Sequence, residues 1–143
     1  MAGANLKKVA LANKLVQFSI KCCRLAVKKR VPWTIENPRA SILWVLPQMR
    51  SLLMQSKAEE GKFDYCQFGM RWRKSTDFRG TLPGLAAASR RCLGAPRGLC
   101  ARTGQPHWQL SGKDPQGTWW TKRAEPYPRP MVNTLAQLVR RSF

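Results

Sequence analysis

The last third of the chain is dense in glycine and proline, and this limits most strongly what the protein can fold into. Between Cys92 and Pro130 these residues recur every few positions, at Gly94, Pro96, Gly98, Gly104, Pro106, Gly112, Pro115, Gly117, Pro126, Pro128 and Pro130. Both residue types interrupt helices and strands, so we expect irregular structure here. A chain of 143 residues has room for only a modest core, so such a tail needs a staple.

Regular elements are predicted on both sides of that tail. Residues 4–30 have helical periodicity with two opposite apolar faces, which predicts a helix packed between two layers. One face holds Leu11, Leu15, Phe18, Cys22 and Leu25, and the other Leu6, Val9, Val16, Ile20, Cys23 and Val27. The sequence also predicts strands at 33–35 and 63–68, a helix over 41–54 interrupted near Pro47, and a basic turn over 69–76. A helix over 133–141 closes the chain, with Leu135, Leu138 and Val139 facing inward.

Together these elements predict an α/β remnant. It consists of a small sheet of at most three strands with flanking helices and an irregular, zinc-stapled C-terminal tail. We divide the chain into residues 1–90, a half domain of helix, strand, helix and basic hairpin, and residues 91–143. The second part holds the loop-rich Cys/His and Pro-rich tail and the terminal helix.

The charge of the chain favours a polyanionic partner. It carries 26 Lys and Arg against 7 Asp and Glu, a net charge of +19, and basic side chains release counterions when they bind phosphates. RNA is favoured over DNA, and an anionic membrane surface is the weaker option. The cations that we expect to bind nucleic acid are Arg71, Arg73, Lys74, Arg90, Arg91, Lys122 and Arg123. Trp72, Trp108, Trp119 and Trp120 lie near them and could stack on bases, although a core position is favoured for most of them.

Several segment types are not expected in this sequence. No apolar stretch reaches the roughly 18 residues that a membrane span needs, and no secretory signal is found. The N-terminal stretch is basic and has no acid before Glu36, as in organellar transit peptides. A mitochondrial location is therefore favoured, with the nucleus as the alternative. Five cysteines, an odd number without a secretory signal, argue against a disulfide framework.

Two short motifs carry a family resemblance. Glu36-Asn37-Pro38 ends a predicted strand, and Tyr65–Thr76 forms a basic hairpin further along. From Ala12 to the C-terminus, the order and spacing of these motifs resemble the second half of a cytosine-5 DNA methyltransferase domain of the divergent viral and protist mobile-element type. The resemblance implies that Glu36, with Asn37 beside it, contacts a flipped base. It also implies that hairpin cations of the set above position the base and the backbone.

The chain departs from that family where catalysis would occur. It lacks a Gly-rich turn for S-adenosylmethionine, since the first 30 residues hold a single glycine, Gly3, and none of its cysteines follows a proline. Without a cofactor site and a Pro-Cys nucleophile, the chain is expected to be catalytically incomplete and not an enzyme on its own. The alternative for Glu36 is a structural one, in which it caps the backbone or pairs with a nearby arginine.

Three cysteines and the single histidine form a second constellation. Cys92, Cys100 and His107 follow one another at spacings of seven and six residues, and Cys66 is the best fourth member. Thiolates and imidazole are zinc ligands, and a closed structural site takes four of them. The alternative is a set of buried thiols and a hydrogen-bonded histidine. A zinc deaminase is rejected, because His107 follows both cysteines and Gln109 stands where that signature needs an acid.

Three functions follow from these patterns. The first is a non-enzymatic RNA-binding structural component of a ribonucleoprotein assembly, such as an organellar ribosome, with other proteins of that assembly as partners. The alternative is one half of a split cytosine-5 methyltransferase completed by a partner chain. A third, weaker hypothesis is a basic interaction module docked on a membrane-associated or protein complex.

Overall fold

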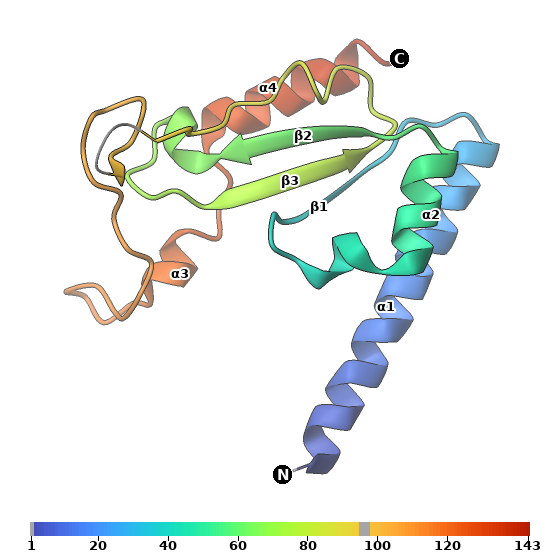
Figure 1. The fold of residues 1–143 in the computed structure, drawn as a ribbon, viewed down its shortest axis with the longest axis horizontal. Helices are drawn as coiled ribbons and strands as arrows, with labels where there is room; N and C mark the ends of the chain where they lie inside the picture. Colours follow the sequence, from blue (N-terminus) through green and yellow to red (C-terminus); the bar gives the residue numbers. More distant parts are fainter. Residues whose placement is uncertain (1, 95–97) are drawn as a thin grey trace.

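A three-stranded antiparallel sheet with the order β1-β3-β2 forms the centre of the protein (Figure 1). The strands are β1 (Thr34–Pro38), β2 (Glu59–Asp64) and β3 (Ser75–Gly80). The computed structural model describes residues 2–94 and 98–143, so residues 95–97 of the predicted irregular tail lie outside the described residues. A small sheet with flanking helices confirms the predicted fold class.

The central strand β3 is held closely on both sides. Its Phe78 lies opposite Glu36 of β1 and Gly61 of β2. At the end of β3, a Cβ atom on Gly80 would come within 2.1 Å of the Trp33 carbonyl oxygen. Only glycine therefore fits at this crossing, where the chain leaves β3 beside the start of β1.

One face of the sheet carries an aromatic core that the C-terminal helix α4 (Arg129–Arg140) covers. This core consists of Phe63, Tyr65, Phe68, Phe78, Leu82, Leu85 and Met131, with Leu135 and Leu138 packed against it. Residues from both predicted parts, 1–90 and 91–143, thus share one core. The prediction that Val139 faces inward is wrong: it is 44% exposed, because it lies on the flank of α4 that carries exposed Val132, to one side of the core-facing Met131, Leu135 and Leu138.

A second core lies between the two N-terminal helices and the start of β1. It consists of Ile20, Cys23, Trp33, Trp44, Met49 and Leu52. Ile20 and Cys23 come from α1 (Ala2–Lys28), and the others include residues of η1 (Ile42–Val45) and α2 (Pro47–Gln55). The predicted interruption at Pro47 is confirmed, because this proline separates η1 from α2 and occupies the first turn of α2.

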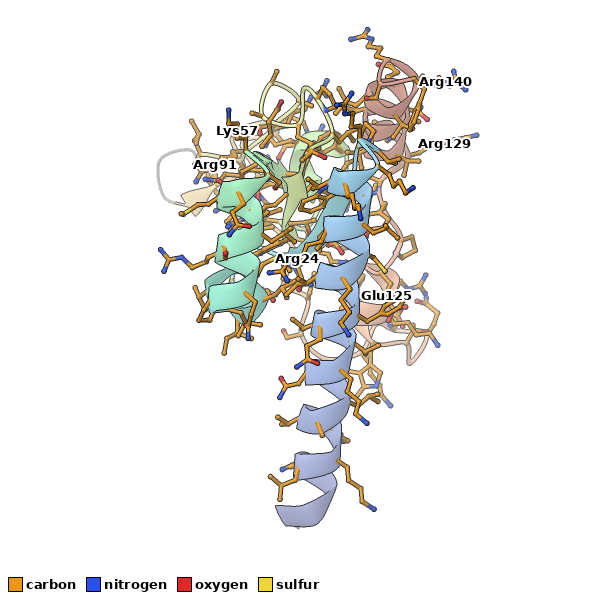
Figure 2. All side chains as sticks on the ribbon, turned by 90° about the vertical axis from the view of Figure 1, so that its right-hand side faces the viewer. Arg24, Lys57, Arg91, Glu125, Arg129 and Arg140 are labelled. Carbon is orange, nitrogen blue, oxygen red and sulfur yellow. The ribbon has the colours of Figure 1, made fainter. Side chains whose placement is uncertain are left out.

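The prediction that α1 packs between two layers is wrong. Only one face of its C-terminal half contacts the second core, and the opposite face, including Leu15 and Phe18, is exposed. Both views show the N-terminal half of α1 extending past the other elements (Figures 1 and 2). Among the described residues, no helix combines the length and apolarity needed to cross a membrane.

The strand predicted over 63–68 is displaced toward the N-terminus in the structure. Strand β2 begins at Glu59, and residues Tyr65–Phe68 form the 3-10 helix η2. The charged residues at its start are compatible with a strand because they pair across the sheet surface. Lys62 lies 2.7 Å from Glu60, which also binds Arg79 of β3. The segment over 81–89, which follows β3, consists mainly of turns.

Helix α4 should contribute to the stability of the whole fold, because fully buried Met131 lies in the aromatic core. We expect Met131→Ala to lower the free energy of unfolding by about 2–5 kcal/mol through the cavity it leaves. Urea unfolding followed by circular dichroism would measure this change. Val132→Ala, on the exposed side of the same helix, is the matched control and should change the value by less than about 0.5 kcal/mol. Equal effects of the two substitutions would contradict this packing.

Candidate metal centre

Cys66, Cys92, Cys100 and His107 converge at one end of the sheet. Their four ligand atoms all lie within 4.8 Å of one another, and the three thiols are buried while the imidazole is half-buried. The ligand atoms of a tetrahedral zinc–thiolate site lie about 3.8 Å apart, so closure around an ion needs shifts of only about 1 Å. This group could therefore hold a metal ion, and the prediction of Cys66 as the fourth member of the cluster is confirmed.

Cys66 is positioned by the helical turn that follows β2. It lies in η2, which ends at Gly69 in a left-handed conformation with a φ of 101°. A residue with a Cβ atom adopts this conformation rarely, so glycine favours the turn at this point. The side-chain amide of Gln67 donates to the Cys66 sulfur at 3.5 Å and further orients the thiol.

Cys92 is attached to the sheet through a buried carboxylate. The backbone amides of Asp64 and Arg90 donate to the carbonyls of Arg90 and Lys62, which lays residue 90 beside the end of β2. The Cys92 amide then donates to Asp64 Oδ2 at 2.7 Å. Because Asp64 immediately precedes η2, this bond fixes Cys92 relative to Cys66.

Cys100 and His107 belong to a loop that folds back on the same point. The Gly104 amide donates to the Cys100 carbonyl at 2.8 Å, and Gly104 has a φ of 66°. The Arg102 guanidinium donates to the Cys66 carbonyl and ties this turn to η2. On the other side, the Trp108 amide donates to the Arg71 carbonyl at 2.9 Å, which places His107 Nε2 3.6 Å from the Cys92 sulfur.

The thiols of the cluster differ in acidity. Burial raises the pKa of Cys66 to about 12, and the neighbouring Cys92 and Cys100 act in the same direction. Burial also acts to raise the pKa of Cys100, but hydrogen bonds from the Arg102 and Thr103 backbone and from the side chains of Thr103 and Cys66 outweigh it, and the pKa falls to about 6. Cys100 therefore loses its proton more readily than Cys66, from which a metal ion would have to displace a proton.

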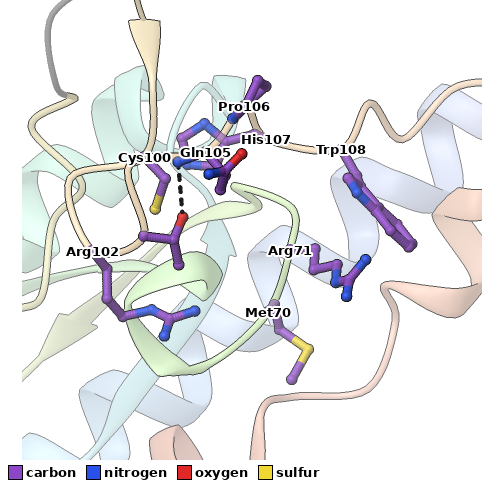
Figure 3. Close-up of a pocket in the computed structure, with 9 residues that line it drawn as sticks. Met70, Arg71, Cys100, Arg102, Gln105, Pro106, His107 and Trp108 are labelled. Atoms are coloured by element: carbon purple, nitrogen blue, oxygen red, sulfur yellow. Dashed lines mark hydrogen bonds between the residues drawn. The ribbon is translucent and has the colours of Figure 1, made fainter.

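A cationic cavity of about 450 Å³ opens beside the cluster (Figure 3). Its lining includes the ligands Cys100 and His107 together with Arg71, Arg102 and Trp108, and it contains no acidic residue. The Arg71 guanidinium lies 4.6 Å from the centre of the Trp108 ring, a cation–π distance. A cavity lined by guanidinium groups and an exposed indole is chemically suited to an anion with an attached planar ring.

The other predicted nucleic-acid contacts divide into free and engaged cations. Arg91 and Lys122 are exposed. Arg73 lies 3.5 Å from Asp64, Lys74 donates to the Ala124 carbonyl, and Arg123 binds Asp114. Arg90 lies over the Phe68 ring at 5.2 Å. The structure thus brings Arg71 into the cavity and uses Arg73, Lys74 and Arg123 for internal contacts.

The tryptophans divide in the same way. Trp72 and Trp120 are half-buried, whereas Trp108 and Trp119 are 43% and 56% exposed. The prediction of core positions for most of these tryptophans is therefore wrong: of the four, Trp72 packs against the aromatic core. Trp108 and Trp120 contact each other edge to face, with ring centroids 5.4 Å apart.

Glu36 and Asn37 lie away from the cavity, on β1. Glu36 is half-buried and faces Tyr127 of the tail. Burial, together with a hydrogen bond to Glu36 and its negative charge, raises the pKa of Tyr127 to about 12. Among the described residues, Glu36 forms no ion pair with an arginine within 4.0 Å. Asn37 is half-buried and lies opposite Asp77.

Sequence reasoning missed Asp64 and Arg102 as supports of the cluster. Asp64 lies two residues before Cys66 within the predicted strand 63–68, and Arg102 follows Cys100 by two residues. An acid between the aromatic residues Phe63 and Tyr65, next to a candidate ligand, is the signal that could have found Asp64. No comparable signal marks Arg102, because its contact with the Cys66 carbonyl spans 36 residues of sequence.

Comparisons of this chain with protein-family models, curated proteins and solved structures find no match.

Asp64 should determine how tightly the cluster holds a metal ion. We expect Asp64→Asn to weaken metal binding about 10- to 100-fold. The neutral asparagine side chain cannot both accept the hydrogen bond from the backbone N–H of Cys92 and form an ion pair with Arg39. Titration with cobalt(II), followed through its thiolate absorption, would measure the affinity. Glu60→Gln on the same strand is the matched control, since the ion pairs of Glu60 with described residues are those with Lys62 and Arg79. Equal cobalt(II) affinities of the two variants would show that Asp64 does not determine metal binding.

Proposed function

We propose that this chain is a non-enzymatic RNA-binding structural component of a ribonucleoprotein assembly, such as an organellar ribosome, and that zinc staples its tail. The observation that carries the proposal is the division of charge in the fold. Most acidic side chains are engaged in contacts within the protein, whereas most basic side chains are directed outward. A surface of this kind attracts a polyanion whether or not it has a catalytic site.

Most of the acids are engaged in internal contacts, and Glu125 is exposed. Asp64 and Asp77 are fully buried, and both bind Arg39. Asp114 binds Arg123, and Glu59 accepts hydrogen bonds from two backbone amides of the turn after β3. In the part of the chain that the structure describes, ion pairs engage only Arg39, Lys62, Arg73, Arg79 and Arg123. Most of the 26 basic residues are therefore available to phosphates.

The cavity beside the metal cluster is the best place for a nucleotide. Arg71 and Arg102 supply charged donors for a phosphate, and the exposed Trp108 indole offers a surface for a base. Single-stranded RNA suits this arrangement, because its bases are free to stack on aromatic rings while cations follow the backbone.

Zinc is the metal that fits the donor set best. Three thiolates and one imidazole are a usual structural zinc set, and softer thiolate ligands disfavour magnesium and calcium. With all four positions filled by protein, such a site has no free position for a substrate. Its role here is to hold Cys92, Cys100 and His107 against η2, so that the cavity walls keep their shape.

The RNA proposal is tested by the affinity of the full chain for a labelled 20-nucleotide single-stranded RNA at several salt concentrations. We expect Arg71→Ala/Arg102→Ala to weaken binding by at least about tenfold at 0.1 M salt while the zinc content is unchanged, because Arg102 also contacts the Cys66 carbonyl. We also expect the salt dependence to decrease by roughly 1.4 in slope, for two lost phosphate contacts. Fluorescence anisotropy gives both values.

The matched control removes the same charge from the exposed end of α4. Arg140→Ala/Arg141→Ala should change the affinity less than about threefold, because these residues lie away from the cavity. Equal losses in the two double variants would reject the cavity as the binding site. Failure of the unmodified chain to bind RNA at 0.1 M salt would reject the function itself.

The zinc proposal predicts one zinc ion per chain after purification without added metal. We expect Cys92→Ala to lose that zinc and to lose protection of residues 91–123 from hydrogen exchange, while α1 and α2 keep theirs. Elemental analysis and hydrogen–deuterium exchange measure the two effects. Cys22→Ala, which removes the exposed cysteine of α1, is the control and should retain the zinc. Purified chain that binds no zinc and has an ordered tail would contradict the staple.

A further inference from the structure

Helix α1 carries a continuous apolar stripe that nothing in the described fold covers. The stripe consists of five exposed side chains, Leu11, Leu15, Phe18, Cys22 and Leu25. Leu15, Phe18 and Leu25 are 59%, 65% and 58% exposed, although the other face of the same helix buries Ile20 and Cys23 in the second core. Figure 2 shows the N-terminal part of α1 extending beyond α2. The stripe is therefore a free surface on a helix that the fold already anchors.

The spacing of the stripe is that of a coiled-coil seam. Its residues follow one another at intervals of four, three, four and three positions, which places Leu15 and Cys22 at a and Leu11, Phe18 and Leu25 at d of a heptad. An ordinary surface helix bearing polar residues on its outer side has no such repeat. The seam spans two heptads.

The charges beside the seam specify the kind of partner. The g position of each successive heptad is a lysine, at Lys7, Lys14, Lys21 and Lys28, and the e positions Ala12, Ser19 and Ala26 are neutral. Residues at g lie against e or g residues of the facing helix and set partner choice. Four lysines in this register match a facing helix that carries acids there.

A second copy of this chain does not provide those acids. A parallel pair would place the lysines opposite Ala12, Ser19 and Ala26, and an antiparallel pair would place lysine against lysine. No Asp or Glu occurs before Glu36 to compensate either arrangement. RNA, in turn, could neutralise the lysines but would leave the apolar stripe exposed to water.

We propose that α1 docks, as a coiled coil, onto an amphipathic helix of another protein that carries Glu or Asp at its e and g positions. The burial of the five stripe residues supplies the affinity, and the four lysines select the partner and its register. The core contact through Ile20 and Cys23 holds the helix preformed, which lowers the ordering cost of association. This surface is distinct from the cavity, so the inference does not depend on RNA binding.

The test uses the full chain and two synthetic peptides of 28 residues. Both peptides have Ile at a and Leu at d; one has Glu and the other Lys at every e and g position. We expect the chain to bind the Glu peptide at least about tenfold more tightly than the Lys peptide in isothermal titration calorimetry at 0.15 M salt. Reversal of the four lysines to Glu should reverse this preference.

Two variants serve as controls. Leu15→Gln/Phe18→Gln removes apolar area from the stripe without touching a core residue, and it should abolish binding of the Glu peptide while thermal stability is kept. Reversal of Lys57, Arg129, Arg140 and Arg141 to Glu changes the net charge by the same amount at residues outside α1, and it should leave the preference unchanged.

Three results would overturn the proposal. The first is binding of the Glu peptide that survives the double Gln substitution, which would indicate attraction by charge alone. The second is dimerisation of the chain through the stripe in analytical ultracentrifugation. The third is binding of α1 to phosphatidylglycerol vesicles, lost in the Gln variant, together with no binding of either peptide.

Discussion

The carboxylate of Asp64 is the interaction on which the rest of the structure depends. It is fully buried, accepts hydrogen bonds from the Ser75 hydroxyl and the Cys92 amide, and pairs with Arg39. A carboxyl group can be buried in this position because each of these partners compensates for lost water. Asp64 lies where β2 ends and η2 begins, so the same group joins the sheet, the segment after β1 and the cysteine loop. The position of Cys92 relative to Cys66 follows directly from it.

The irregular tail also contains a buried carboxylate that binds backbone amides and an arginine. Asp114, also buried, accepts hydrogen bonds from the Gln116 and Thr118 amides and binds the Arg123 side chain. The segment therefore acquires order from a carboxylate that gathers backbone amides, because it has no strand ladder to satisfy them. Along the sequence, the four residues of the metal cluster lie between Asp64 and Asp114. After Asp114, Tyr127 packs on Tyr65 and Phe78, and α4 then covers the sheet. A tail rich in glycine and proline can thus be ordered by a few polar centres.

The sequence allowed most of the regular elements and the cysteine cluster to be predicted. It did not allow the contacts between distant elements to be predicted. Helical periodicity located α1, Pro47 located the break before α2, and ligand chemistry identified Cys66 as the partner of Cys92, Cys100 and His107. Periodicity could not show that the stripe of α1 lacks a partner, because an apolar face has the same pattern whether it meets its own chain or another. The start of β2 was missed because its charged residues depend on cross-strand pairs with Arg79. Asp64 was missed because its contacts join residues that are distant in sequence.

The division of charge makes this fold dependent on its surroundings. Because the acids neutralise Arg39, Arg73, Arg79 and Arg123 inside the protein, the remaining cations repel one another across the surface, and the net charge of +19 destabilises the compact state. Any polyanion that binds only the folded chain relieves this repulsion and adds its binding free energy to the stability. An acidic helix on α1 would do the same at the other end of the molecule, where the four lysines lie along one edge. The two proposed binding sites, the cavity and α1, would therefore couple the stability of the chain to the binding of its partners.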